Sequence, residues 1–336
     1  MTKKTLSLVE SVRLRPGMYF GDVDSCSGAN SVVYELVSNV VDHFLAGRAS
    51  FVRVVVDGHN IYVEEDGPGL PFAQPSPNDK SDHLAEHCLL RWHETATADG
   101  HAPHVHVLGG CFGLAVLNAG AASLDVVSKN GSAVYRQTFV DGRAQTKSSV
   151  APCTDAQGTK VHVQLSKEVF GHRTPHLPSL RRTLFEVAHF YPGLVVELQD
   201  ERFVSRWGLL DLAFALLSPS SAQATYPPPP EFSYSGILDG VQLQVAAVGE
   251  AKKTAFRSWV NGLETEAGGA HVNALKRALA KVDWTPAVAL VQVIMHRPEF
   301  AGPTKSSLKS RSVAPALRKM LVPALEAFTS STEPLT

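Results

Sequence analysis

Four consecutive prolines, Pro227 to Pro230, constrain the fold of this 336-residue chain more than any other feature. They close a polar stretch that runs from Ser218 to Glu231. Proline has no backbone N–H and a fixed φ, so this run excludes a helix interior or a central strand and stiffens the chain as an extended spacer. The chain length also suits two domains better than one. We therefore predict two domains, residues 1–205 and 206–336, with a proline-rich linker near 218–231.

Composition excludes several classes of protein. The 31 basic and 32 acidic residues give a formal net charge of -1, which argues against a surface built throughout to grip nucleic acid. No apolar run reaches the roughly 18 residues that span a bilayer, and the N-terminus has no signal-peptide core. The four cysteines form no Cys-x-x-Cys pair and are read as free thiols: Cys26, Cys88, Cys111 and Cys153. We expect a soluble cytoplasmic protein.

Hydrophobic patterning predicts α+β structure in both domains. In the first domain the predicted helices are 31–45 and 177–190, and the predicted strands are 51–57, 60–64, 124–128, 134–139 and 161–165. Asp57-Gly58 is the predicted hairpin turn between the first two strands. In the second domain the predicted helices are 206–217, 269–281 and 314–328, and the predicted strands are 240–248, 255–260 and 286–296.

Three polar residues share one face of the predicted helix at 31–45. Glu35, Asn39 and Asp42 stand at i, i+4 and i+7 between apolar neighbours. One interpretation of this face is a solvated helix surface. The other is a chemical site, in which Glu35 acts as a general base and the Asn39 side-chain oxygen binds Mg²⁺.

Two glycine-containing segments add to the chemistry of the first domain. Residues 65–69, Glu-Asp-Gly-Pro-Gly, come directly after a predicted strand. They form either an acidic β-turn or a turn whose carboxylate accepts a hydrogen bond from the exocyclic amine of a base. Residues 109–113, Gly-Gly-Cys-Phe-Gly, run into a helix-like segment in the manner of a phosphate-binding loop. They match neither the P-loop nor the dinucleotide-binding fingerprint.

The order of these motifs resembles the ATPase subunits of the bacterial type IIA topoisomerases, DNA gyrase B and topoisomerase IV. Residues 12–22 are similar to the N-terminal signature of that family, and residues 34–47 to its catalytic helix. Further segments follow in the family's order: 124–142, 158–159, 259–262, 268–271 and 303–308. The resemblance covers nearly the whole chain. It implies an α+β fold, a two-layer GHKL (Bergerat) ATPase sandwich followed by a ribosomal-S5-like transducer domain.

The resemblance implies ATP and Mg²⁺ as ligands. Glu35 is then the general base that activates water, and Asn39 is a magnesium ligand. Lys305 is implied to sense the γ-phosphate and to link the two domains. From the residue types alone, a lone lysine is more often a surface charge.

The resemblance also implies the residues around the base and the phosphates. Asp42 lies near the adenine side of the pocket, and Thr159 and Glu65 bind adenine through a water, with Asp66 beside them. The glycines implied at the pocket wall and the phosphates are Gly67, Gly69, Gly109, Gly110 and Gly113.

Several positions depart from the family pattern. Glu65 stands where the family has aspartate, and the extra methylene moves the carboxylate outward by about one bond length. His43 and Pro68 replace a glutamate–arginine pair, and Ser31 replaces a histidine that orients the catalytic glutamate. Cys111 replaces a glycine of the phosphate loop, where a side chain crowds the approach of backbone N–H groups.

Two hypotheses follow from the resemblance and its departures. The first is a module that binds and hydrolyses ATP and forms a homodimer when nucleotide is bound. The family's metal-binding Toprim motifs are absent, so we expect no DNA cleavage by this chain alone. The N-terminal arm, which in gyrase crosses to the partner subunit, is also shorter. The alternative is a degenerate nucleotide- or protein-binding module that regulates a gyrase-like subunit, or acts as its decoy, with little turnover.

Two clusters of side chains leave further interpretations open. Four histidines have spacings that zinc can use, or are incidental members of a solvated segment: His83, His87, His104 and His106. Five basic residues form either a solvated surface or a weak, salt-sensitive, sequence-independent DNA contact: Lys305, Lys309, Arg311, Arg318 and Lys319.

Overall fold

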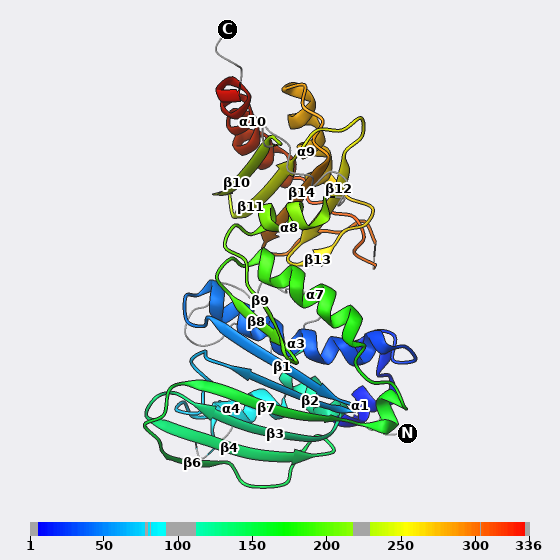
Figure 1. Cartoon of the computed structure of the whole chain (residues 1–336). Helices are drawn as coiled ribbons and strands as arrows, with labels where there is room; N and C mark the ends of the chain where they lie inside the picture. Colours follow the sequence, from blue (N-terminus) through cyan, green and yellow to red (C-terminus); the bar gives the residue numbers. More distant parts are fainter. Residues whose placement is uncertain are drawn as a thin grey trace. The chain divides into compact units, whose positions relative to one another are not determined.

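The computed structural model describes residues 6–77, 80, 82–91, 112–217, 229–302 and 304–332 (Figure 1). The chain divides into two compact units. The first holds the described residues up to 188 together with 193–204, and the second holds 189–192 and the described residues from 205 onward. Residues 218–228, most of the predicted proline-rich linker, lie outside the described part.

The first unit is built on a nine-stranded sheet with strand order β5-β4-β3-β7-β2-β1-β8-β9, in which β6 also pairs with β4. All neighbours are antiparallel except β1 and β8, which are parallel. The strands are β1 (Phe51–Asp57), β2 (Asn60–Glu65), β3 (Ala121–Lys129), β4 (Ala133–Val140), β5 (Arg143–Ala144), β6 (Ser149–Pro152), β7 (Gly158–Leu165), β8 (Val195–Leu198) and β9 (Glu201–Phe203).

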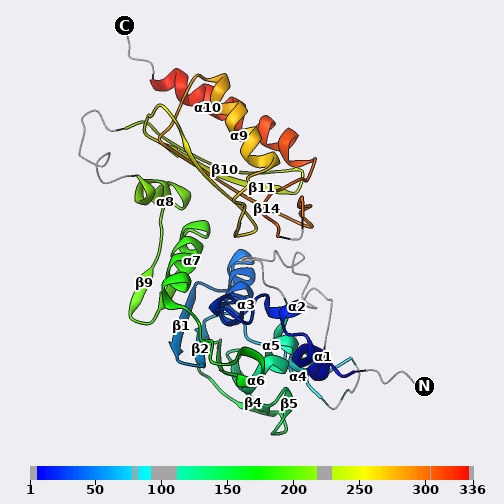
Figure 2. The same ribbon diagram turned by 90° about the vertical axis from the view of Figure 1, so that its right-hand side faces the viewer.

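Helices cover one face of this sheet. The longest, α3 (Cys26–Leu45), packs on β1 and β2, while α5 (Leu114–Gly120) packs on β3, and both lie on the same side of the strands (Figure 2). Ser25 caps the N-terminus of α3, because its hydroxyl accepts the Ser27 N–H at 3.2 Å. The remaining helices of this unit are α1 (Leu8–Leu14), α2 (Gly17–Phe20), α4 (Leu84–Leu90), α6 (Lys167–Phe170) and α7 (Leu177–Phe190), whose last two residues belong to the second unit.

The N-terminal helix is held to the rest of the first unit by Arg13. Its guanidinium donates to the Ala119 and Ala121 carbonyls at 3.1 and 3.0 Å and forms ion pairs with Asp141 and Glu168, both at 2.8 Å. The Arg13 side chain is largely buried, so these bonds satisfy a charge that would otherwise be costly to desolvate. Arg13, which belongs to the N-terminal signature at 12–22, therefore connects α1 to α5, β3 and α6.

The second unit is a five-stranded sheet with helices on both faces. Its strand order is β10-β11-β14-β12-β13, with β12 and β14 parallel. Helices α9 and α10 pack on each other over one face, and α8 packs on β11 and β14. The elements are α8 (Leu209–Leu216), β10 (Glu231–Leu238), β11 (Val241–Val248), β12 (Ala255–Val260), β13 (Leu263–Glu264), α9 (Ala270–Lys281), β14 (Val288–Met295) and α10 (Val313–Thr332).

The α+β prediction is confirmed, and each predicted helix and strand has a counterpart within a few residues of its predicted bounds. The longest element that the sequence did not predict is β10, whose sequence Glu-Phe-Ser-Tyr-Ser-Gly-Ile-Leu carries a weak alternation and only one buried side chain. The shorter elements that were not predicted are α1, α2, α4, α6, β5, β6, β8, β9 and β13. None of the described helices is long and apolar enough to cross a membrane. Three of the predicted free thiols are free in the structure, Cys26, Cys88 and Cys153, and Cys111 lies outside the described residues.

Candidate nucleotide site

Glu35 is a buried carboxylate on the inner side of α3, with 3% of its surface exposed. Its Oε2 accepts a hydrogen bond from the Phe112 backbone N–H at 3.1 Å. Phe112 is itself fixed, because its ring packs edge-on against Phe20 with the ring centroids 4.8 Å apart. A buried charge needs such a donor. The carboxylate is thus aimed at the segment where α5 begins.

Ser31, the residue that stands in place of the family's orienting histidine, bonds within its own helix. Its hydroxyl donates to the Gly28 carbonyl at 2.7 Å. In this chain a backbone N–H, that of Phe112, orients Glu35, whereas the family uses a histidine side chain.

Asn39 and Asp42 follow Glu35 along the same face of α3 and are half-buried. The face they share spans about 10 Å, since a helix rises about 1.5 Å per residue. Within the described residues, the Asn39 side chain makes no hydrogen bond and offers its amide oxygen. A lone oxygen of this kind fits Mg²⁺, which keeps several waters and takes its other ligands from phosphates.

Glu65 and Thr159 face each other across the antiparallel β2–β7 pair, as direct partners in the register. Burial raises the pKa of the Glu65 carboxyl, and hydrogen bonds from Thr159 and from the Gly67 N–H oppose that rise. Thr159 Oγ1 also lies 3.2 Å from Ser128 Oγ on β3. These hydroxyl and carboxyl groups form one connected polar cluster, of the kind that can bind a base edge or a water.

Backbone geometry explains the glycines around this cluster. Gly69 has φ +78°, and a Cβ there would lie 2.6 Å from Ser128 Oγ. Gly158 has φ +141°, and its Cβ would lie 2.3 Å from the Glu65 carbonyl oxygen. Neither position accepts a side chain without displacing the residues that carry the cluster.

Gly67 and His43 define the edge of the same turn. A Cβ on Gly67 would lie 2.5 Å from Glu65 Oε2 and 3.2 Å from His43 Cδ2. The imidazole of His43 therefore lies beside the acidic turn. Only glycine leaves room for the Glu65 carboxyl to fold back onto the Gly67 N–H.

Asp66, placed beside the adenine by the resemblance, has its carboxylate engaged elsewhere. Oδ1 accepts the backbone N–H groups of Ser50 and Phe51 at 2.8 and 2.9 Å, and Oδ2 accepts the Ser50 hydroxyl at 2.5 Å. These bonds anchor the start of β1 to the end of β2. The carboxyl group that hydrogen-bonds to Thr159 is that of Glu65.

The predicted phosphate loop, residues 109–113, is described only at Phe112 and Gly113. Gly113 has φ +82° and caps α5, and its carbonyl accepts the N–H groups of Val116 and Leu117 at 3.1 Å. A Cβ on Gly113 would meet nothing within 4 Å, so only its φ, which strains L side chains, argues for glycine there. Gly109, Gly110 and Cys111 lie outside the described residues, and their phosphate contacts stay predictions.

Lys305 belongs to the second unit and is exposed. It has φ +55°, in the left-handed region, and its N–H donates to the Gly302 carbonyl at 3.1 Å. This tight turn presents the lysine on a loop between β14 and α10. Its contact with a nucleotide stays a prediction.

The zinc interpretation has no described set of ligands. No group of three or more His, Cys, Asp or Glu side chains placed for a metal occurs in the described part of the chain. His83 instead precedes α4 and packs edge-on against Tyr135, with the ring centroids 6.1 Å apart. His104 and His106 lie outside the described residues.

Phe112 and Ser128 are the site residues that sequence reasoning missed. Phe112 acts through its backbone N–H, which any residue type except proline carries, so no sequence signal marks it. Ser128 stands in the middle of a predicted strand, and its role depends on the β3–β7 pairing that places it beside Thr159.

Comparison with known proteins shows which sequences this chain resembles. The DNA gyrase B protein of Caulobacter vibrioides (strain NA1000 / CB15N) is 25% identical over 362 aligned positions, which cover 95% of this chain and 44% of that protein. The DNA gyrase B protein of Streptococcus pyogenes serotype M1 is 27% identical over 361 positions, covering 97% of this chain and 54% of that protein. The chain is similar in sequence to DNA gyrase B proteins over nearly its whole length. It spans about half the length of the curated relatives it matches.

Solved structures show that this chain has the expected fold. The 43K ATPase domain of Thermus thermophilus gyrase B, in complex with an aminocoumarin, superposes with a TM-score of 0.79 at 23% identity and covers 97% of this chain and 91% of that one. The topoisomerase IV ATP-binding domain of Francisella tularensis gives a TM-score of 0.73 at 21% identity, covering 97% and 92%. No family model matches the chain. The GHKL sandwich followed by a transducer domain is thereby confirmed.

Proposed function

We propose that this chain binds ATP with Mg²⁺, hydrolyses it, and forms a homodimer when nucleotide is bound. The observation that carries the proposal is the placement of Glu35, a buried carboxylate held by a backbone N–H at the start of α5. An ionised carboxylate beside a phosphate-binding segment can accept the proton of an attacking water.

The other residues divide the remaining tasks. Glu65 and Thr159, supported by Ser128, would hold the base edge, and Asn39 would hold Mg²⁺ through its amide oxygen. Bound Mg²⁺ would neutralise charge on the phosphate oxygens. Lys305 would contact the γ-phosphate and so couple the second unit to the nucleotide.

The second candidate is a nucleotide- or protein-binding module with little turnover, which regulates a gyrase-like subunit. It is favoured by Ser31, which stands where the family has its orienting histidine and whose hydroxyl donates to the Gly28 carbonyl of its own helix. The loss of a group that orients a general base lowers kcat more than it lowers binding.

ATP turnover by the wild-type chain, beside Glu35→Gln, tests the first candidate. We expect the wild type to hydrolyse ATP with Mg²⁺ and the rate per chain to rise with protein concentration. Glu35→Gln should lose about a hundredfold or more in kcat while ATP still raises its melting temperature. Equal, negligible rates in both proteins with an intact thermal shift would establish the binding module. No thermal shift at millimolar ATP would reject the first candidate and leave only the protein-binding form of the second.

A further inference from the structure

The acidic group at the proposed base position already accepts hydrogen bonds from its own chain. The hydroxyl and the backbone N–H of Thr159 both donate to the Glu65 carboxyl. The Gly67 N–H donates to Oε2 of the same group. The two oxygens of a carboxylate offer about four acceptor positions, so these three bonds leave one position for a ligand.

Two hydroxyl groups behind this carboxyl commit their protons toward it. Ser128 Oγ accepts the Leu70 N–H at 2.7 Å and lies 3.2 Å from Thr159 Oγ1. A hydroxyl donates a single proton, and the proton of Thr159 goes to Glu65. Ser128 is therefore the donor in the bond between the two hydroxyls. Since both side chains are buried, the Thr159 proton stays with Glu65 and does not reach a base.

Close packing holds these bonds in place. A Cβ at Gly67 would lie 2.5 Å from Glu65 Oε2, and a Cβ at Gly69 would lie 2.6 Å from Ser128 Oγ. A Cβ at Gly158 would lie 2.3 Å from the Glu65 carbonyl oxygen. The Glu65 carboxyl therefore has its orientation set before a ligand arrives, and a turn toward the ligand would break bonds that the packing maintains.

Adenine and guanine offer different groups to such a carboxyl. Adenine presents an amine that donates and a ring nitrogen, N1, that accepts, whereas guanine presents an oxygen that accepts and an N1–H that donates. A site selects adenine when it places an acceptor at the amine and a donor at N1. The free acceptor position of Glu65 can take the adenine amine or the guanine N1–H, and the Thr159 hydroxyl proton is not offered to adenine N1.

We propose that this site binds guanine nucleotides as well as adenine nucleotides, with Glu65 accepting the donor of either base. A site rejects an analogue strongly when the exchange leaves one of its buried polar groups unpaired. The Glu65 carboxyl keeps its bonds from Thr159 and Gly67 with either base, so this penalty does not arise. The substrate range depends on the nucleotide site proposed above and widens it from ATP to purine nucleoside triphosphates.

Calorimetric titration of the wild-type chain with Mg²⁺ tests this range. The ligands are the β,γ-imido triphosphates of adenosine and guanosine, which resist hydrolysis. We expect each analogue to displace the other and their dissociation constants to agree within about tenfold, because neither base leaves a polar group unpaired. A larger preference for the adenosine analogue would overturn the proposal and leave the ATP site standing. Binding of neither analogue at millimolar concentration would reject the nucleotide site and this range together.

The variant Glu65→Ala shows whether one carboxyl serves both bases. It removes the acceptor of either base and frees the Thr159 hydroxyl proton for adenine N1. It should therefore weaken the guanosine analogue at least as much as the adenosine analogue, by about tenfold to a hundredfold for a hydrogen bond to a charged group. A loss confined to the adenosine analogue would show that Glu65 recognises adenine alone, and the proposal would fail.

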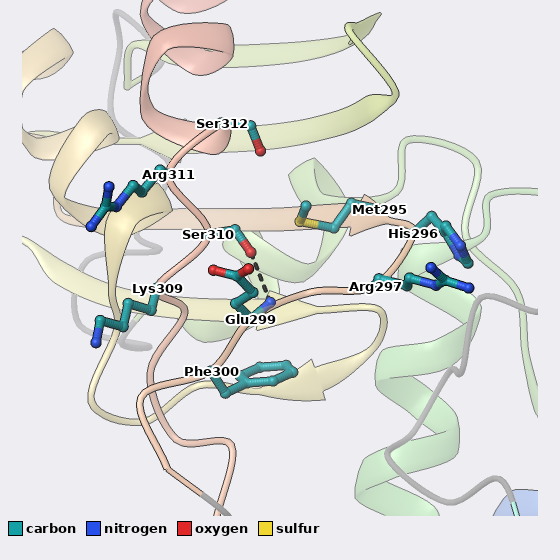
Figure 3. Close-up of a pocket in the computed structure, with 9 residues that line it drawn as sticks. All are labelled: Met295, His296, Arg297, Glu299, Phe300, Lys309, Ser310, Arg311 and Ser312. Carbon is teal, nitrogen blue, oxygen red and sulfur yellow. Dashed lines mark hydrogen bonds between the residues drawn. The ribbon is translucent and has the colours of Figure 1, made fainter.

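Two matched variants control for the loss of a carboxylate. Glu64→Ala removes the neighbouring side chain, which pairs with Lys160 at 2.8 Å and points to the other face of the strand. Glu299→Ala removes a carboxylate that lines a pocket of the second unit (Figure 3). Neither control should change the affinity for either analogue. The melting temperature of each variant without nucleotide reports on folding, and the wild-type comparison needs no variant at all.

Discussion

The Phe112 backbone N–H donates to the Glu35 carboxylate at 3.1 Å, across 77 residues of sequence. Glu35 comes from the middle of α3, and Phe112 directly precedes the glycine that caps α5. The proposed general base is therefore positioned by the segment that would also bind phosphate. Any change to that segment acts on the base as well.

Removing the Phe112 N–H should impair hydrolysis more than binding. Phe112→Pro lacks the donor, whereas Phe112→Leu keeps the N–H and changes only the ring packing. A hydrogen bond to a charged group contributes about 1.5–3 kcal/mol, so kcat of Phe112→Pro should fall about tenfold to a hundredfold. Similar losses in both variants would show that the ring, not the N–H, holds Glu35.

The half-buried Glu65 carboxyl should make the stability of the fold depend on pH. Burial raises its pKa above the usual 4.5, so the folded state binds the proton more tightly than the unfolded state. The corresponding stability is present below 4.5 and is lost as pH rises through the folded pKa. Urea unfolding of Glu65→Gln should therefore show a gain over the wild type at neutral pH that disappears below 4.5. A difference independent of pH would contradict this assignment.

Gly158, with φ +141°, should tolerate alanine far worse than a positive-φ glycine in open space. At Gly158 a Cβ would lie 2.3 Å from the Glu65 carbonyl oxygen, whereas at Gly131, with φ +87°, it would meet nothing within 4 Å. Gly131→Ala should cost about 1–2 kcal/mol for its left-handed backbone. Gly158→Ala should cost about 1–3 kcal/mol more because the site is overpacked. Denaturant unfolding of the pair measures the difference, and equal losses would argue against the close β2–β7 approach.

His271 should destabilise the second unit in acid. It is fully buried, its Nε2 lies 3.1 Å from Thr265 Oγ1, and burial lowers its pKa to about 4 from 6.5. The unfolded chain binds the proton first, so stability is present above 6.5 and is lost as pH falls through 4. The loss is on the order of 3 kcal/mol, at about 1.4 kcal/mol per pKa unit. Unfolding of His271→Gln should be flatter between these pH values, and parallel curves for both proteins would refute the prediction.

Local patterns were sufficient to predict most of the elements. The alternation in Phe51–Asp57, the Asp57-Gly58 turn and the helical period of Leu177–Phe190 are properties of short segments, and each appears in the structure. Strand β10 was missed because its exposed edge carries serine, tyrosine and glycine instead of an apolar alternation. The start of α3 was placed five residues late, since Cys26 to Asn30 are small or polar and enter the helix through the Ser25 cap.

The sequence by itself determined the residue types of the candidate site, the helical spacing of Glu35, Asn39 and Asp42, and the glycines of the acidic turn. These depend on backbone period and on steric freedom, which act over a few residues. Only the tertiary structure decided that Thr159 pairs with Glu65, that the Asp66 carboxylate is engaged at β1, and that a backbone N–H positions Glu35. Such contacts join segments far apart in the chain, and strand register and helix packing select their partners without any local mark.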